Sequence, residues 1–140
     1  WISFSAFIIA VFSALRLAKF NIDTRQSENF IGLPTPANAL LIASFPLIIA
    51  ESSTYFAEFI LNHWFLAIFS FIMSMLLVAE VPLISLKFKS LKFQENLLRY
   101  ILIISSVLLL LFLKFEAVPV IILIYFLISL IQFRSADKNS

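Results

Sequence analysis

The chain has 140 residues, of which 62% are hydrophobic and only 13% are charged, and its mean hydropathy is +1.06. A soluble domain of this size needs polar groups over much of its surface. The ten basic and eight acidic side chains of this chain are too few to cover such a surface. The composition excludes an ordinary soluble domain and predicts an all-α fold, a polytopic integral membrane helical bundle. Because the chain lacks cysteine, disulfides, thiolate metal sites and cysteine nucleophiles are excluded as well.

Apolar runs of membrane length follow one another along the chain. They cover residues 1–18, 35–50, 64–86, 98–113 and 117–133, and they predict about five transmembrane helices in one region, 1–140. At about 1.5 Å per residue these runs approach or reach the hydrocarbon thickness of about 30 Å. Pro46 and Pro82 fall within predicted spans and are expected to kink them.

The positions of the basic residues predict the orientation of the helices. Nine of the ten Lys and Arg fall in the first and third connections, their flanks and the C-terminal tail, and Lys114 is the exception. By the positive-inside rule, the N-terminus of this chain lies outside and the C-terminus lies in the cytoplasm. The net charge of +2 is too small to indicate a nucleic-acid partner.

Polar residues near the cytoplasmic boundary are candidates for a site. Arg16 and Lys19 share one helical face, and they either reach lipid headgroups or enter a polar cavity. Gly32 is the only glycine, so we expect it where the backbone needs a positive φ or a close approach. Asn38, just inside the second span, either bonds to a neighbouring helix or lines a polar site.

Two further features of the spans have alternative interpretations. Glu80 is predicted inside the third span, where a carboxylate is a functional candidate, but pairing with a nearby cation or partial exposure explains it equally well. Small residues recur every fourth position of the first span and favour close packing on a neighbouring helix. They are Ala6, Ala10, Ala14 and Ala18.

Three stretches of the chain together carry a family resemblance. They are residues 14–21 (ALRLAKFN), 32–39 (GLPTPANA) and 76–89, the last with its EVP and LKFK pieces. Together they resemble the C-terminal part of the bacterial CDP-diacylglycerol–serine O-phosphatidyltransferases, the phosphatidylserine synthase branch of the CDP-alcohol phosphatidyltransferase family. The resemblance covers nearly the whole chain, and the first two stretches are the more specific.

The resemblance implies a reaction and a location. The serine hydroxyl attacks the lipid-linked phosphate of CDP-diacylglycerol, CMP leaves, and phosphatidylserine remains in the bilayer. The implied partners are CDP-diacylglycerol, L-serine and membrane lipid, in the bacterial inner (cytoplasmic) membrane, and a homodimer is left open. Arg16, Lys19 and Asn21 fall in matched motifs at the cytoplasmic face, so the resemblance implies that they bind substrate.

The resemblance also implies a divalent metal, Mg²⁺ or Mn²⁺, held in the full-length enzyme by aspartates that include the proposed base. That aspartate-rich motif is absent from this sequence and is expected immediately upstream of Trp1, which is not a Met. We therefore assign no catalytic residue and no metal ligand to this chain, and we expect the chain alone to be inactive. The alternative is a non-catalytic polytopic membrane module, a transporter subunit or a scaffold, in which the helices serve packing alone.

The predicted orientation is testable with single cysteines, since the chain has none of its own. An impermeant thiol reagent added to spheroplasts should label Ser53→Cys, in the second connection, and leave Ser90→Cys, in the third, unlabelled. Both positions should react after lysis, which controls for intrinsic reactivity. Equal labelling before lysis would contradict the five-span orientation.

Overall fold

The structure is a computed structural model that describes residues 2–22, 30–51, 54–84 and 96–137. It is helical apart from one short antiparallel pair of strands, so the all-α expectation is confirmed. In chain order the elements are η1 (Ile2–Ser5), α1 (Ala6–Ile22), β1 (Phe30–Ile31), α2 (Thr35–Glu51), α3 (Thr54–Leu61), α4 (His63–Val78), β2 (Pro82–Leu83), α5 (Leu97–Leu113), η4 (Lys114–Glu116) and α6 (Ala117–Asp137).

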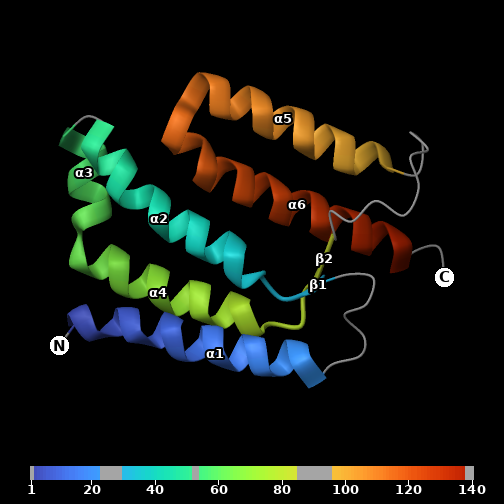
Figure 1. The fold of residues 1–140 in the computed structure, drawn as a ribbon, viewed down its shortest axis with the longest axis horizontal. Helices are drawn as coiled ribbons and strands as arrows, with labels where there is room; N and C mark the ends of the chain where they lie inside the picture. The colour runs from blue at the N-terminus through green and yellow to red at the C-terminus, as the bar shows by residue number, and fades with distance from the viewer. Residues whose placement is uncertain (1, 23–29, 52–53, 85–95, 138–140) are drawn as a thin grey trace.

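The long helices alternate in direction, so their termini gather at two ends of the bundle (Figure 1). One end holds the C-terminal ends of α1, α4 and α6 and the N-terminal ends of α2 and α5. It carries Arg16, Lys19 and Arg99, and we call it the basic end. At the opposite end the Lys114 ammonium hydrogen-bonds to Glu51, and this bond raises the pKa of Lys114 above its ordinary value.

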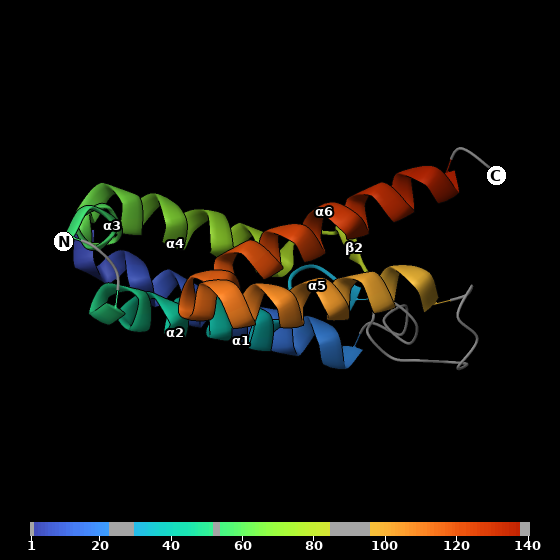
Figure 2. The same ribbon diagram turned by 90° about the horizontal axis from the view of Figure 1, so that it is seen from above.

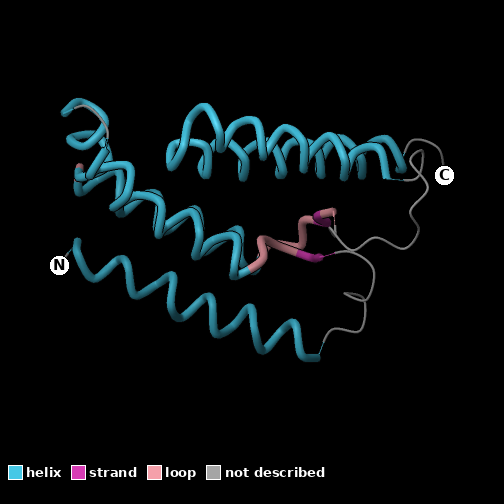
Figure 3. The backbone as a smooth tube through the Cα atoms, turned by 45° about the horizontal axis from the view of Figure 1, so that its top comes forward, coloured by secondary structure: helices cyan, strands magenta, loops and turns pink. Residues whose placement is uncertain are grey.

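The helices form two staggered rows, with α4 and α6 in one row and α1, α2 and α5 in the other (Figure 2). Packing runs mainly between the rows, because α1 lies against α4, α5 against α6, and α2 against α6. The strands β1 and β2 lie at the basic end, beyond the start of α2 (Figure 3). They pair antiparallel, with Phe30 opposite Leu83 and Ile31 opposite Pro82.

The helix in the third apolar run is shorter than expected. It ends at Val78, and Pro82 lies in β2 rather than inside a helix. A proline disfavours helical backbone at the residue before it and cannot donate a hydrogen bond itself, so the helix stops before Val81. The predicted kink at Pro82 is therefore wrong, and Glu80 follows the helix instead of lying inside it. Pro46, by contrast, lies inside α2 as expected.

One helical stretch of the described residues, Leu97–Gln132, is long and apolar enough to cross a membrane, and an 18-residue window within it has a mean hydropathy of 2.6. It comprises α5, η4 and most of α6, which Figure 1 shows as two antiparallel arms. The helices α2 and α4 are apolar but shorter. The second connection, expected to be polar, contains the short helix α3.

The buried core is small and lies towards the basic end, between α2, α4, α5, α6 and the strand pair. Its members are Leu33, Leu41, Met73, Leu83, Ile84, Leu102 and Tyr125. Many large apolar side chains point away from it, among them Phe7 at 66% exposure and Phe112 at 83%. The four small residues on the stripe of α1 are also exposed, so they do not pack on a described helix as expected.

Gly32 adopts the left-handed backbone that its isolation in the sequence predicted, with a φ of 81°. A Cβ at this position would lie 2.7 Å from the carbonyl oxygen of Leu77 and 2.8 Å from that of Ala79. These are backbone atoms at the end of α4, which cannot move aside without disturbing the helix. Both expectations for Gly32, a positive φ and a close approach, are therefore confirmed.

Several residues named from the sequence lie outside the described residues, and the structure places none of them. They are Trp1, Ser53, Ser90 and residues 85–89 of the third motif stretch, which include its LKFK piece.

The Gly32 geometry predicts a large penalty for the smallest side chain. Gly32→Ala should destabilise the fold by about 2 to 4 kcal/mol, because it adds left-handed strain to a steric clash with fixed carbonyls. Thermal unfolding in detergent, followed by circular dichroism, measures the loss. Ala43→Gly, an exchange in the reverse direction at an exposed position of α2, should cost only about 0.5 to 1 kcal/mol. Equal stability of Gly32→Ala and the parent would contradict the close approach of Gly32 to the carbonyls of Leu77 and Ala79.

Candidate functional site

The described parts of the three stretches that carry the family resemblance lie together at the basic end. Residues 14–21 form the C-terminal part of α1, residues 32–39 form the turn into α2, and the third stretch begins with the end of α4 and β2. The amide of Gly32 donates to the carbonyl of Val81 at 2.8 Å, and the amide of Leu33 donates to the carbonyl of Leu76 at 2.9 Å. The second stretch therefore binds directly to the third.

One of these two bonds, from Leu33 to Leu76, also caps the end of α4. The last four carbonyls of a helix have no partner within the helix. Leu33 supplies a donor to Leu76, and the Lys19 ammonium lies 3.5 Å from the carbonyl of Val78. A cation at this position also complements the negative end of the helix dipole. The end of α4 is thus capped by residues distant in the sequence.

Arg16 connects the first stretch to the second. Its side chain is buried, at 3% exposure, and its Nε donates to the carbonyl of Leu33 at 3.4 Å. The guanidinium carbon lies 5.8 Å from the ring centre of Phe20, within range of a cation–π contact. A buried cation is stable only where polar partners replace water. Arg16 is therefore buried within the described part of the protein and does not extend towards lipid headgroups.

Beside Arg16 lies a cavity of about 260 Å³, lined on one side by α1 and on the other by the turn into α2. The α1 side consists of Arg16, Leu17 and Phe20, and the α2 side is the segment 34–36. Segment 34–36 belongs to the second motif stretch, but no residue type in it indicates a place in the site. Asn38, one turn further along α2, is buried, and its Oδ1 has no hydrogen-bond partner among the described residues.

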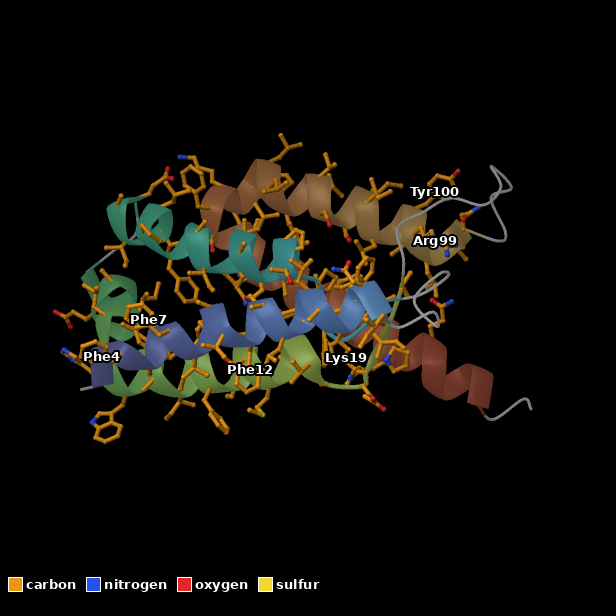
Figure 4. All side chains as sticks on the ribbon, turned by 60° about the horizontal axis from the view of Figure 1, so that its bottom comes forward. Phe4, Phe7, Phe12, Lys19, Arg99 and Tyr100 are labelled. Atoms are coloured by element: carbon orange, nitrogen blue, oxygen red, sulfur yellow. The ribbon has the colours of Figure 1, made fainter. Side chains whose placement is uncertain are left out.

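Lys19 and Asn21, the other two predicted site residues, have different surroundings. The Lys19 ammonium pairs with the Glu80 carboxylate at 3.1 Å, which realises the local pairing considered for Glu80. Figure 4 shows Lys19 at the basic end of α1, the end that also carries Arg99 and Tyr100, far from Phe4 and Phe7. Asn21 is exposed and is not among the lining residues of the cavity.

Sequence reasoning missed a contact between α6 and the third stretch. The Tyr125 hydroxyl donates to the carbonyl of Ile84 at 2.9 Å, and the Ser129 hydroxyl accepts the amide of Ile84 at 3.2 Å. Both backbone groups of Ile84 are thus satisfied by one helix. The sequence does contain a pattern that could predict this contact. Tyr125 and Ser129 are polar residues four positions apart in an apolar run, so they share one face of the helix.

The described residues do not fit a divalent metal site. Such a site needs several carboxylate oxygens that converge on the ion, and no group of three His, Cys, Asp or Glu comes together in the described ranges. At the basic end the structure describes the carboxylate of Glu80, and this carboxylate pairs with Lys19. The described residues of the basic end therefore offer no set of metal ligands.

The amino-acid sequence of this chain is similar to those of two known proteins. The chain is 30% identical over 127 residues to each of two curated proteins from two strains of Helicobacter pylori, both named CDP-diacylglycerol–serine O-phosphatidyltransferase. The expected resemblance is confirmed. The match covers 89% of this chain, and the chain spans about half the length, 51%, of these relatives. No protein-family model matches the chain.

The ion pair of Lys19 with Glu80 should contribute to stability rather than to catalysis. Both partners are partly exposed, at 32% and 66% of their side chains, so we expect a coupling energy of about 0.2 to 1 kcal/mol. A double-mutant cycle with Lys19→Ala and Glu80→Gln, measured by unfolding in detergent, gives this value. Lys19→Ala should cost more than Glu80→Gln, because it also removes the cation beside the Val78 carbonyl. Strict additivity of the two changes would show that the pair is not formed.

Proposed function

We propose that this chain is part of a phosphatidylserine synthase that transfers the phosphatidyl group of CDP-diacylglycerol to L-serine. The observation that carries the proposal is that the described parts of the three motif stretches lie together at the basic end, where Leu33 bonds to both the buried Arg16 and Leu76. The similarity to two named phosphatidyltransferases supports it. In the reaction the serine hydroxyl oxygen bonds to the phosphorus that carries diacylglycerol, the bond from that phosphorus to the CMP oxygen breaks, and CMP leaves.

We propose that the chain spans the bacterial inner membrane about five times, with its C-terminus in the cytoplasm. The alternating helices and the gathering of Arg16, Lys19 and Arg99 at one end support this orientation. The many exposed large apolar side chains support a lipid environment, because contiguous apolar surface is rare on soluble monomers. In this arrangement the basic end faces the cytoplasm.

We assign the parts of the basic end to the substrates. The Arg16 guanidinium is a planar fork that suits phosphate or carboxylate oxygens, and Leu33 and Phe20 hold it at the cavity. Exposed Asn21 lies where a water-soluble amino acid arrives, and we assign it to L-serine. Lys19 contributes a positive charge while it holds the end of α4. Mg²⁺ or Mn²⁺, and the acids that hold it, belong to the full-length enzyme, in the part not represented in this chain.

A second candidate is a non-catalytic polytopic membrane module. The observation that favours it is the lack of an acidic cluster in the part of the chain that the structure describes. The two candidates differ in one respect that is easily measured: a synthase releases CMP in a serine-dependent way, and a scaffold does not.

The proposed function predicts a specific response to changes at Arg16 in the full-length enzyme. Arg16→Ala should lower kcat/KM roughly tenfold to over a hundredfold, which corresponds to about 1.5 to 3 kcal/mol for a charge-assisted hydrogen bond. Arg16→Lys should recover only part of the loss, because an ammonium lacks the planar fork. CMP release is measured with CDP-diacylglycerol and L-serine varied separately.

Two measurements separate this effect from simple unfolding. Lys114→Ala removes a cation at the opposite end and should leave turnover unchanged, and the unfolding temperature of each Arg16 variant reports the stability of its fold. Near-normal turnover of Arg16→Ala with both substrates would overturn the assignment of Arg16 to the substrate site.

A further inference from the structure

The side of β2 that faces away from β1 is held by side chains of α6. Residues of an extended strand direct their backbone groups alternately to one side and the other. The bond from the Gly32 amide to the Val81 carbonyl places the backbone groups of residue 81 towards β1, so those of residues 82 and 84 are directed away from it. Pro82 has no amide hydrogen, and the donor that must be satisfied on this side is therefore that of Ile84.

Two hydroxyls of α6, which we call the hydroxyl pair, satisfy Ile84. The Tyr125 hydroxyl donates to its carbonyl at 2.9 Å, and the Ser129 hydroxyl accepts its amide at 3.2 Å. The Ser129 hydroxyl donates its own proton to the Tyr125 carbonyl at 2.8 Å, which leaves its oxygen able to accept. All three residues are buried. Water therefore has no ready access to replace a lost partner, and both bonds to Ile84 hold the strand in one position.

From Ile84 a short series of contacts leads to Arg16. Leu83, the residue before it, pairs with Phe30 in the sheet. The chain then continues from β1 to Leu33, whose carbonyl accepts the Arg16 Nε at 3.4 Å. A sheet of two short strands has little stability of its own. Its position thus depends on what holds its two sides: the end of α4 through the Gly32–Leu33 segment, and α6 through the hydroxyl pair.

We propose that the hydroxyl pair positions Arg16 for its substrate. The helix α6 fixes β2, β2 fixes β1 and the turn that follows, and the Leu33 carbonyl in that turn orients the guanidinium. This inference rests on the proposed function, and it makes Tyr125 and Ser129 positioning residues of the same site. The position matters because a guanidinium forms directional bonds to oxyanions, and a displacement of about 1 Å at a reacting centre can cost about a hundredfold in rate.

The test is a double-mutant cycle on turnover in the full-length enzyme. Tyr125→Phe and Ser129→Ala each remove one bond to Ile84 at almost constant volume, and each should lower kcat/KM for CMP release about tenfold. In the Arg16→Ala background, Tyr125→Phe should change kcat/KM by less than about twofold, because no guanidinium is left to position. A simple loss of folded enzyme would lower turnover by the same factor in both backgrounds.

Ser105→Ala is the matched control. The Ser105 hydroxyl also donates to a carbonyl of its own helix, that of Leu102 at 3.0 Å, but it belongs to α5, and its removal should leave turnover unchanged. Unchanged turnover of both Tyr125→Phe and Ser129→Ala overturns the positioning role even when the enzyme is active. Equal losses from Tyr125→Phe in the two backgrounds overturn it as well.

Hydrogen exchange followed by mass spectrometry tests the same coupling without substrate. In the full-length enzyme the combined variant Tyr125→Phe with Ser129→Ala should speed exchange of the amides of residues 30–33, which the hydroxyl pair contacts only through β2. The amides of residues 66–74, in the middle of α4, should exchange as in the parent. Unchanged exchange at residues 30–33 overturns the coupling. If the unmodified enzyme releases no CMP with L-serine, the proposed function fails and the positioning role fails with it, whatever the exchange shows.

Discussion

The crossing of the Gly32–Leu33 segment over the end of α4 is the constraint on which the rest of the basic end depends. Two backbone amides of this segment occupy the carbonyls of Val81 and Leu76, and the approach is so close that no Cβ fits at Gly32. In an apolar environment unpaired carbonyls are costly, because no water replaces the missing donor. The crossing satisfies these groups and at the same time fixes the turn that leads into α2.

The position of Arg16 follows from that crossing. The carbonyl of Leu33 points towards α1 and accepts from the Arg16 side chain, so the same residue that caps α4 also orients the buried cation. Lys19, one turn further, ties the end of α1 to Glu80. From the other side α6 holds both backbone groups of Ile84. Helices that are distant in the sequence thus hold a small set of polar contacts in one place, while apolar faces elsewhere remain exposed.

Charged groups lie at both ends of the described bundle, with Arg16, Lys19, Glu80 and Arg99 at the basic end and Glu51, Lys114 and Glu116 at the opposite end. Between the two ends the helices expose many large apolar side chains. The described residues bring no three acids together.

The sequence by itself determined the helical class, the grouping of the basic residues, the role of Gly32 and the family resemblance. These follow from composition, charge position and short motifs, which are local properties of the chain. It did not determine where α4 ends, because the third apolar run continues to residue 86 and the competing effect of Pro82 depends on the strand that it joins. Nor did it show that Arg16 is buried against Leu33, or that Glu80, although exposed, pairs with Lys19. Only the tertiary structure decided these, because each depends on a partner, Leu33 or Lys19, that is brought close by the packing of α1 on α4.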